Sequence, residues 1–160
     1  MDELEFIDAN KNNKLLAREL LAEYGHYLFE ELKLMADNEN FFEELEKFPD
    51  YKYKPPHGAF FIIYNHKTPI GCVGLKRFDE DSCELKRMYI REQFRGKGFA
   101  KTILAFALDK ANLLGYKKVL LDTHIAMAAA VKAYIRAGFV EIPQYCANEN
   151  PNPVFLAYTF

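Results

Sequence analysis

Tryptophan is absent from this 160-residue sequence, and cysteine occurs only as Cys72, Cys83 and Cys146. No cysteine lies in a CxxC pair or at metal-ligand spacing from a histidine, so we expect reduced thiols and no bound metal. Hairpin register should place Cys72 nearer Tyr89 than Cys83, which argues against a disulfide between those two cysteines. An excess of positive charge is also missing, because the formal net charge is −2. We therefore expect no nucleic-acid partner, since such binding depends on a basic surface.

Long apolar segments are missing as well. The first ten residues, MDELEFIDAN, are acidic and lack the apolar centre of a signal peptide. The longest apolar runs are too short to cross a membrane as a helix. Repeats, low-complexity tracts and Gly/Ser linkers are absent too, while half of the residues are apolar, enough for a substantial core. We therefore expect one cytoplasmic domain over residues 1–160, without a membrane partner.

The hydrophobic pattern that is present alternates between helix and strand periods. Helices are expected after a cap at Asn12 or Asn13 through Leu28, between Asp37-Asn38 and Pro49, from Gly98 to Leu114, and from Met127 to Gly138. Strands are expected in LEFID, GAFFIIY, PIGCVGLKRF, CELKRMYI, KKVLLDTH, FVEIP and PVFLAYTF, with YKYKPPHG as a loop. This order predicts an α/β domain in which a mixed sheet carries helices on its faces.

The stretch EQFRGKGFAK, residues 92–101, joins a strand pattern to a helix pattern. A helix N-terminus offers unpaired N–H groups to an anion, and Gly96 and Gly98 let the backbone approach a ligand closely. Three basic side chains add positive charge: Arg95, Lys97 and Lys101. These features indicate a phosphate or pyrophosphate site, or else a glycine turn with solvated basic side chains. The spacing fits neither GxxxxGK[ST] nor GxGxxG.

Two sequence blocks point to one family. The first is Gln93-x-x-Gly96-x-Gly98 followed by Ala100, within CELKRMYIREQFRGKGFAKTIL. The second is AVKAYIRAGF, in which a tyrosine is followed four residues on by Gly-Phe. Together they resemble the acetyl-coenzyme A signature and a later helix motif of the GNAT (Gcn5-related N-acetyltransferase) superfamily. The resemblance covers about residues 58–142 of the chain.

The resemblance implies a three-layer α/β/α fold with a mixed, mostly antiparallel sheet that is splayed between its fourth and fifth main strands. It also implies acetyl-CoA as cosubstrate, with the thioester in that opening. The pantetheine arm would run beside the end of the fourth strand, and the pyrophosphate would bind backbone amides of the glycine turn. The implied coenzyme-binding residues are Met88, Tyr89, Ile90, Arg95, Gly96, Lys97, Gly98, Phe99, Ala100 and Lys101.

The resemblance further implies transfer of an acetyl group to a primary amine by direct attack in a ternary complex. The N–H of Met88 would stabilise the oxyanion, Glu84 would act as general base, and Tyr134 would protonate the departing thiolate. Glu84 could instead be a strand-end glutamate paired in water with Lys86 or Lys118, and Tyr134 could simply pack beneath the sheet. Met127 departs from the family pattern, because many members have Asn or Gln there to contact the coenzyme.

The acceptor is left open as an amine of a small molecule, peptide or protein. In this family the first two helices wall the acceptor site, and the loop YCANENPNP is expected to rim it. Acidic side chains could attract a cationic amine or be solvated surface: Glu39, Glu43, Glu44 and Asp79 to Asp81. His124 could face the cleft or be satisfied by neighbours. Cys146 lacks a positioned base and is no expected nucleophile.

Two other functions remain open at this stage. One is a non-catalytic acyl-CoA-binding or regulatory module on the same fold. The other is a phosphate-ligand enzyme of a different fold, which would prefer nucleotides to CoA. A homodimer is also possible, since dimers are common in the family.

Overall fold

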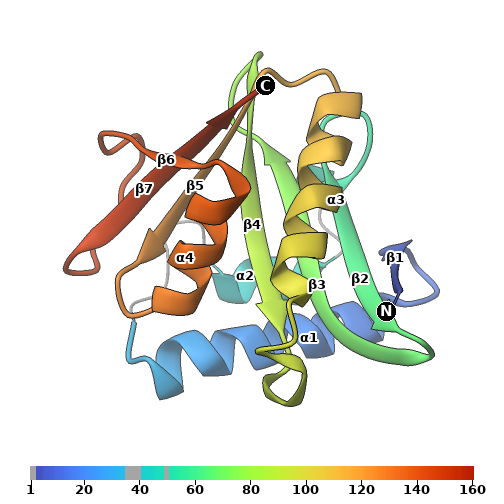
Figure 1. The fold of residues 1–160 in the computed structure, drawn as a ribbon. Helices are drawn as coiled ribbons and strands as arrows, with labels where there is room; N and C mark the ends of the chain where they lie inside the picture. The colour runs from blue at the N-terminus through green and yellow to red at the C-terminus, as the bar shows by residue number, and fades with distance from the viewer. Residues whose placement is uncertain (1–2, 35–40, 49–50) are drawn as a thin grey trace.

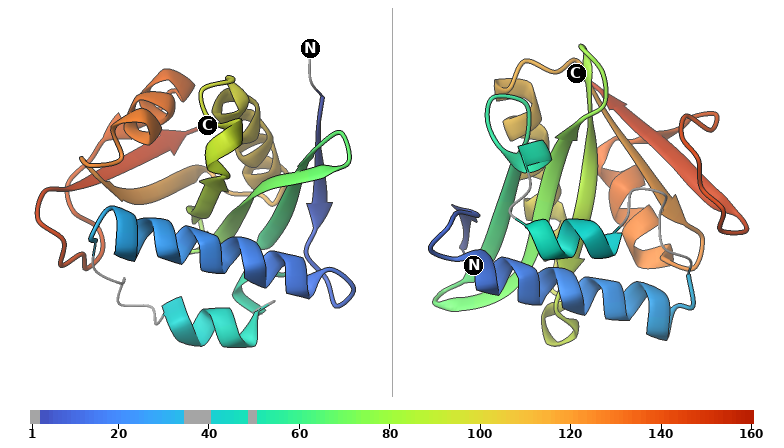
Figure 2. Two further views of the ribbon diagram at one scale, coloured as in Figure 1. Left: turned by 90° about the horizontal axis from the view of Figure 1, so that it is seen from below. Right: turned by 180° about the vertical axis from the view of Figure 1, so that it is seen from behind.

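A computed structural model of the chain describes residues 3–34, 41–48 and 51–160. A central sheet lies between two layers of helices (Figure 1). Helices α1 (Lys14–His26) and α2 (Phe41–Lys47) cover one face, and α3 (Phe99–Leu113) and α4 (Ala128–Ala137) cover the other, as Figure 2 shows from two further sides. The expected three-layer α/β/α architecture is confirmed. Within the described ranges, no helix is both long and apolar enough to span a membrane.

The described residues form a seven-stranded sheet in the order β1-β2-β3-β4-β5-β7-β6. All neighbouring strands are antiparallel except β4 and β5, which are parallel. The strands are β1 Leu4–Asp8, β2 Ala59–Asn65, β3 Thr68–Arg77, β4 Ser82–Ile90, β5 Lys118–His124, β6 Val140–Glu141 and β7 Pro153–Thr159. The predicted strand FVEIP is thus reduced to the two residues of β6. Cys72 lies opposite Tyr89, as the hairpin register predicted.

The opening in the sheet lies between β4 and β5. In the described chain these strands pair only at their beginnings, where Ser82, Cys83 and Glu84 lie opposite Lys118, Val119 and Leu120. Beyond this point the two strands diverge (Figure 1), while β5 stays paired with β7 along its whole length. The predicted splay between the fourth and fifth strands is therefore confirmed, and it gives the sheet a gap with two exposed backbone edges.

Two apolar clusters hold the layers together, one on each face of the sheet. The larger lies under α3 and α4 and includes Ile103, Leu104 and Phe139. The smaller lies under α1 and includes Leu20 and Phe48. Burial of such side chains supplies the main favourable free energy of folding. The walls of the gap between β4 and β5 are thus fixed by packed layers on both sides.

Helix α1 passes through Gly25 without a break and continues into a π-helical turn, Tyr27–Glu31. A Cβ at Gly25 would lie 2.6 Å from Cε1 of Phe41, which real atoms do not tolerate. The glycine therefore lowers intrinsic helix propensity but lets α2 pack closely against α1. This packing places both helices beside the gap in the sheet.

Some local predictions are corrected by the structure. Asn13 precedes α1 as predicted, but its side chain makes no cap hydrogen bond to the helix; its Nδ2 donates to the carbonyl of Asp8 instead. The segment predicted as a loop, YKYKPPHG, begins with a 3-10 turn at Tyr51–Tyr53. The predicted helix start near Asp37-Asn38, its end at Pro49, and Glu39 lie outside the described residues.

Candidate active site

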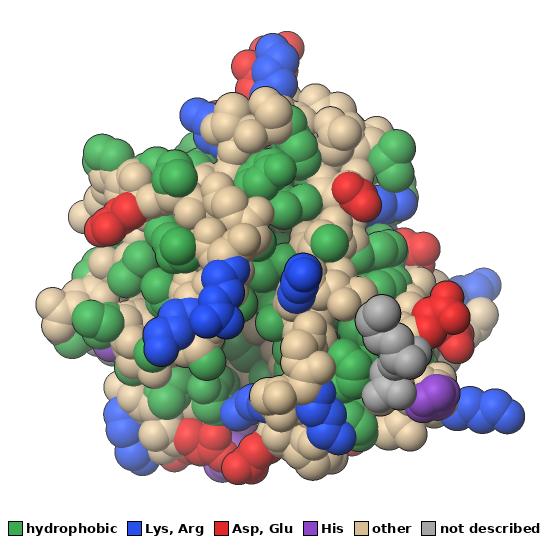
Figure 3. Space-filling view, in the orientation of Figure 1, with side chains coloured by type: hydrophobic (Ala, Val, Ile, Leu, Met, Phe, Trp, Pro, Cys, Tyr) green, Lys and Arg blue, Asp and Glu red, His purple; other side chains and the backbone are tan. Residues whose placement is uncertain are grey.

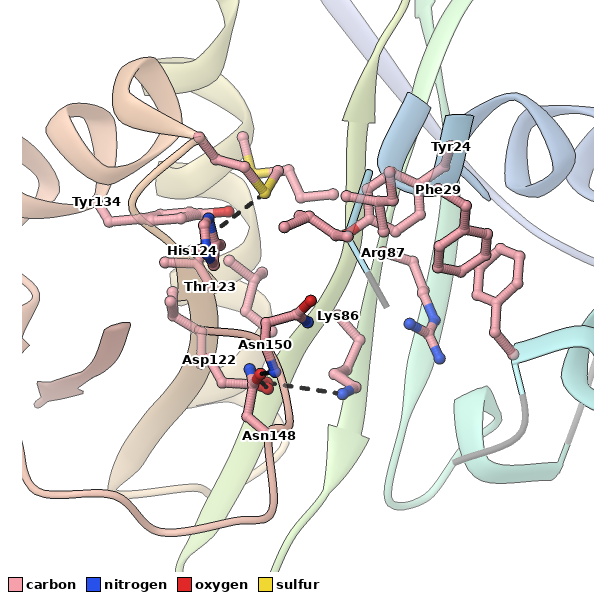
Figure 4. A pocket seen from close by; sticks show the side chains of 17 residues that line it. Tyr24, Phe29, Lys86, Arg87, Asp122, Thr123, His124, Tyr134, Asn148 and Asn150 are labelled. Carbon is pink, nitrogen blue, oxygen red and sulfur yellow. Dashed lines mark hydrogen bonds and ion pairs between the residues drawn. The ribbon is translucent and has the colours of Figure 1, made fainter. Parts of the chain in front are cut away.

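A pocket lies where β4 and β5 separate (Figure 4). Its facing walls are residues 85–88 of β4 and 121–124 of β5, and Tyr134 of α4 and Met127 close one side. The remaining lining comes from α1, the π-helical turn, the residues just after that turn, α2, and the loop between β6 and β7: Tyr24, Leu28, Phe29, Leu34, Phe41, Asn148 and Asn150. The helices and the loop that were expected to surround the acceptor thus line this pocket, and binding of the acceptor here stays a prediction.

A β-bulge in β4 shapes one wall of the pocket. Cys72 pairs with Tyr89 and Gly74 with Lys86, so two residues of β4, Arg87 and Met88, oppose one residue of β3. Arg87 has a φ of 57°, which is uncommon for a residue with a side chain. A bulge bends a strand and re-aims its backbone groups. The irregularity therefore lies directly before the N–H of Met88, the predicted oxyanion donor.

The unusual conformation of Arg87 is accompanied by a buried ion pair. Its Nε and Nη2 donate to the two carboxylate oxygens of Glu44 at 3.2 and 2.8 Å, and its guanidinium lies 4.9 Å from the centre of the Phe41 ring. Both charged side chains are almost fully buried. Glu44 was one of the acidic residues that could attract a cationic amine, but its negative charge is neutralised by Arg87. Glu43 pairs with Lys47 in the same helix.

The glycine turn joins the end of β4 to α3. Gly96 and Gly98 have φ of 75° and 83°, and a Cβ at either would meet no atom within 4 Å. Gly98 precedes α3 in the left-handed conformation, so the first N–H groups of this 15-residue helix lack intrahelical acceptors. Lys and Arg side chains gather on the face formed by α3 and α4, around a hollow (Figure 3). The turn therefore has the open backbone and positive surroundings that a phosphate group requires.

The side chain of Arg95 contacts other residues of the protein. Its Nε donates to the carbonyl of Ile90 at 2.7 Å, and its guanidinium lies 4.4 Å from the centre of the Tyr27 ring. The Tyr89 ring packs against Tyr24 and Tyr27, and burial raises the pKa of Tyr89 to about 12. These side chains fix the end of β4 against α1.

Tyr134 of α4 lines the pocket with only 7% of its surface exposed. The centre of its ring lies 5.9 Å from that of Phe139. Tyr134 therefore both packs beneath the sheet and faces the pocket. Burial, together with the nearby Tyr24 and Asp122, raises the pKa of Tyr134 well above its usual range. The phenol therefore stays protonated at neutral pH and can donate a proton to a neighbouring group.

Glu84 lies in β4 behind the pocket wall, with 4% of its surface exposed. Its Oε2 accepts a hydrogen bond from the Tyr145 hydroxyl at 2.8 Å and lies 4.0 Å from Nζ of Lys86. Its predicted alternative partner Lys86 is therefore present, but the pair is buried rather than in water. Lys86 also lies 3.9 Å from Oδ1 of Asp122, so the two carboxylates share one ammonium.

His124 and Met127 lie on the pocket wall. Nδ1 of His124 accepts the N–H of Ala126 at 2.9 Å, so Nε2 carries the proton and donates to the carbonyl of Pro151. The backbone thus provides hydrogen-bond partners for both ring nitrogens, in agreement with the alternative that neighbouring groups satisfy His124. The Thr123 hydroxyl donates to the sulfur of Met127 at 3.6 Å, so the position where many family members carry an amide is apolar here.

The family model of the Acetyltransferase (GNAT) family matches residues 16–139, a range that includes the glycine turn, both diverging strands and α4. The chain belongs to the GNAT acetyltransferase family. An uncharacterized N-acetyltransferase of Schizosaccharomyces pombe is 32% identical over 145 residues, which cover 89% of this chain and 83% of that protein. N-acetylaspartate synthetase of Rattus norvegicus is 37% identical over 90 residues, 56% of this chain and 30% of the rat protein.

Solved GNAT structures share this fold. One is spermidine N-acetyltransferase from Vibrio cholerae in complex with CoA and spermine. It superposes with a TM-score of 0.74 and 21% identity, covering 98% of this chain and 95% of that one. At this level of identity the similarity concerns the fold. This shared fold agrees with the mixed sheet described above, in which β4 and β5 are parallel.

Three potential metal ligands meet at the edge of the GNAT pocket. Donor atoms of Glu84, Asp122 and Cys146 lie within 4.8 Å of one another. The ammonium of Lys86 lies 4.0 and 3.9 Å from the two carboxylates, where it would repel a cation. Burial and the two carboxylates also raise the pKa of Cys146 to about 12, so its thiol is protonated at neutral pH. These contacts favour an internally paired cluster, and the expectation of no metal stays a prediction.

Several pocket residues were missed by the sequence interpretation. Lys86 and Arg87 are adjacent charges in the middle of a strand that otherwise reads as buried, which is itself a signal of paired or functional charges. Asp122 interrupts the apolar run of KKVLLDTH in the same way. Arg87 bonds Glu44, 43 residues away, and Glu84 bonds Tyr145, 61 residues away, so no local pattern connects these partners.

Proposed function

We propose that this protein transfers the acetyl group of acetyl-CoA to a primary amine of a small molecule, peptide or protein. The observation that carries the proposal is the joint presence of two features on β4. One is the gap beside β5 that Tyr134 lines, and the other is the open glycine turn that follows the strand. The first suits a thioester and its acceptor, and the second suits a pyrophosphate.

Acetyl-CoA would lie along the unpaired edge of β4. Pairing of β4 with β5 ends at Glu84, so residues 88–90 present a backbone edge to which the pantetheine amides can bond. The pyrophosphate would bind the amides of residues 95–101, with Lys97 and Lys101 exposed beside them. The V. cholerae enzyme was solved with CoA, which supports CoA as the cosubstrate class.

Catalysis would divide among three groups. The N–H of Met88, after the bulge, would stabilise the oxyanion that forms when the amine attacks. Tyr134 would protonate the departing thiolate, for which its raised pKa keeps the proton available. The amine's proton would go to one of the two carboxylates that share the Lys86 ammonium, Glu84 or Asp122. The amine would attack the thioester directly in a ternary complex, so that no acyl-enzyme intermediate is needed.

The acceptor side of the pocket combines an aromatic wall with polar groups. Tyr24, Phe29 and Phe41 form the wall, and Asp122 and Asn148 lie on the polar side. The rat relative is named for N-acetylaspartate, which is acidic, and the V. cholerae neighbour is named for spermidine, which is a basic amine. We therefore propose a primary amine as the acceptor class and test both charge types.

The test is thiol release from acetyl-CoA with a panel of L-aspartate, L-lysine, spermidine and 2-phenylethylamine. Mass spectrometry of each amine identifies the acetylated product. We expect at least one amine to be acetylated at a rate that saturates with acetyl-CoA. Tight CoA binding without acetylation of any amine by the wild-type protein would favour the acyl-CoA-binding module instead.

A further inference from the structure

Asp122 is the acidic side chain that belongs to the pocket wall. Among the described residues that line the pocket it is the one carboxylate, and Glu84 is not part of the lining. The Asp122 side chain is 13% exposed and that of Glu84 is 5% exposed. Figure 4 shows Asp122 on β5, across the gap from Lys86 on β4. An acceptor in this pocket therefore meets Asp122 before it can meet Glu84.

Two polar side chains lie against the Asp122 carboxylate. Asn148 donates from Nδ2 to Oδ2 at 3.1 Å, and Lys86 lies 3.9 Å from Oδ1. The titratable groups that face Asp122 come from three elements: Glu84 and Lys86 of β4, Tyr134 of α4, and Tyr145 and Cys146 of the loop between β6 and β7. One ammonium between two carboxylates leaves an unbalanced negative charge beside the pocket, which favours a protonated amine.

We propose that Asp122, rather than Glu84, takes the proton from the ammonium group of the acceptor. This inference rests on the acetyl transfer proposed above and assigns one further catalytic residue to it. Glu84 then acts as a positioning residue. It holds Lys86 beside Asp122, and the Tyr145 hydroxyl holds Glu84. In the second charged pair near the pocket, Arg87 donates two hydrogen bonds to Glu44, and this pair is not needed in the step.

The step balances as follows. An oxygen of Asp122 takes one proton from the acceptor ammonium, and the freed nitrogen lone pair attacks the thioester carbon. The carbonyl π pair moves to oxygen, beside the N–H of Met88, and returns when the C–S bond breaks. Tyr134 gives its proton to the departing sulfur and regains one from the acylated nitrogen. The products are the amide, CoA with a free thiol, and one proton that Asp122 releases to solvent.

The test compares Asp122→Asn, Glu84→Gln and the control Asp109→Asn, which changes an exposed aspartate of α3. Asn keeps the shape of Asp122 and can still accept from Asn148. Each variant is assayed with the panel amine that the wild-type protein acetylates fastest, at pH values from about 6 to 10. CoA affinity and melting temperature are measured in parallel, so that a folding defect is recognised.

We expect Asp122→Asn to lower kcat/KM by roughly 100-fold near pH 7, the lower range for loss of a general base, with CoA affinity unchanged. The deficit should shrink as pH rises, because the amine then loses its proton to solvent. Glu84→Gln should have a smaller effect. A near-wild-type rate for Asp122→Asn, a deficit that is constant with pH, or a larger deficit for Glu84→Gln would overturn the assignment. Absence of transfer by the wild-type protein would instead contradict the proposed function.

Discussion

The guanidinium of Arg87 on β4 and the carboxylate of Glu44 on α2 form a two-bond ion pair, with Nη2 and Oε2 2.8 Å apart. Their side chains are 4% and 3% exposed. The pair joins the bulge of β4 to α2, whose Phe41 lines the pocket. It thereby connects the predicted oxyanion donor, Met88, to the shape of that pocket.

Removing one partner of this pair should be costly. We expect Glu44→Gln to lower the free energy of unfolding by about 3 to 5 kcal/mol, because it leaves the buried charge of Arg87 without its anion. The double variant Glu44→Leu, Arg87→Met should recover much of this loss, since no buried charge remains. Urea unfolding of the single and double variants measures both effects. A loss of less than about 1 kcal/mol for Glu44→Gln, the value of an exposed pair, would contradict the assigned burial.

Gly98 and Gly115 offer a matched test of the glycine turn. Both have positive φ, 83° and 94°, and both have open space where a Cβ would lie; they flank the two ends of α3. Alanine at either position should cost about 1 to 2 kcal/mol of stability through backbone strain. Only Gly98→Ala should also weaken CoA binding, because its Cβ would stand beside the amides of the turn. Equal CoA affinities of the two variants by calorimetry would show that the turn is not the pyrophosphate site.

Tyr134→Phe removes a hydroxyl but keeps the ring that packs on Phe139. We expect kcat for acetyl transfer to fall by roughly 10- to 100-fold, at or below the usual range for loss of a general acid because a thiolate leaves readily. The KM for acetyl-CoA should change little. Because the pKa of Tyr134 is raised, its ionisation should not limit the rate between pH 7 and 9. An unchanged kcat would reduce Tyr134 to a packing residue.

The thiol of Cys146 gives a pH-dependent readout of the acidic cluster. Its pKa is raised to about 12 by burial and by Asp122 and Glu84, so the thiolate fraction in the folded protein should keep rising tenfold per pH unit beyond pH 9. In urea the pKa should return to about 8.5, and the labelling rate should level off above that pH. Iodoacetamide labelling at pH 7 to 10, followed by peptide mass spectrometry, measures both rates. A plateau near pH 9 in the folded protein would contradict the shift.

Local signals in the sequence predicted much of the fold and part of the site. The glycines of the turn after β4 and Gly138 after α4 are required by backbone conformation at those positions, so sequence spacing alone locates them. The separation of β4 from β5 came from the family resemblance. The predicted strand FVEIP was too long, because pairing along a sheet edge depends on partners far away in sequence.

The electrostatics of the site could not be predicted in the same way. Whether Glu84 lies in water or in the protein depends on Tyr145, and whether Glu44 attracts an amine depends on Arg87. Both partners are brought in by tertiary packing. The family resemblance implied a carboxylate on β4, Glu84, as the base, whereas the carboxylate on the pocket wall is Asp122 of β5.

The central claim is that this pocket and turn bind acetyl-CoA, and a thermal-shift titration with acetyl-CoA, CoA and ATP tests it most directly. A ligand that binds only the folded protein adds about 2.7 kcal/mol at 100 times its Kd, which raises the melting temperature visibly. We predict that acetyl-CoA and CoA stabilise the protein and that ATP does not. Stabilisation by neither CoA form would contradict the account, since acetyl transfer cannot proceed without the cosubstrate.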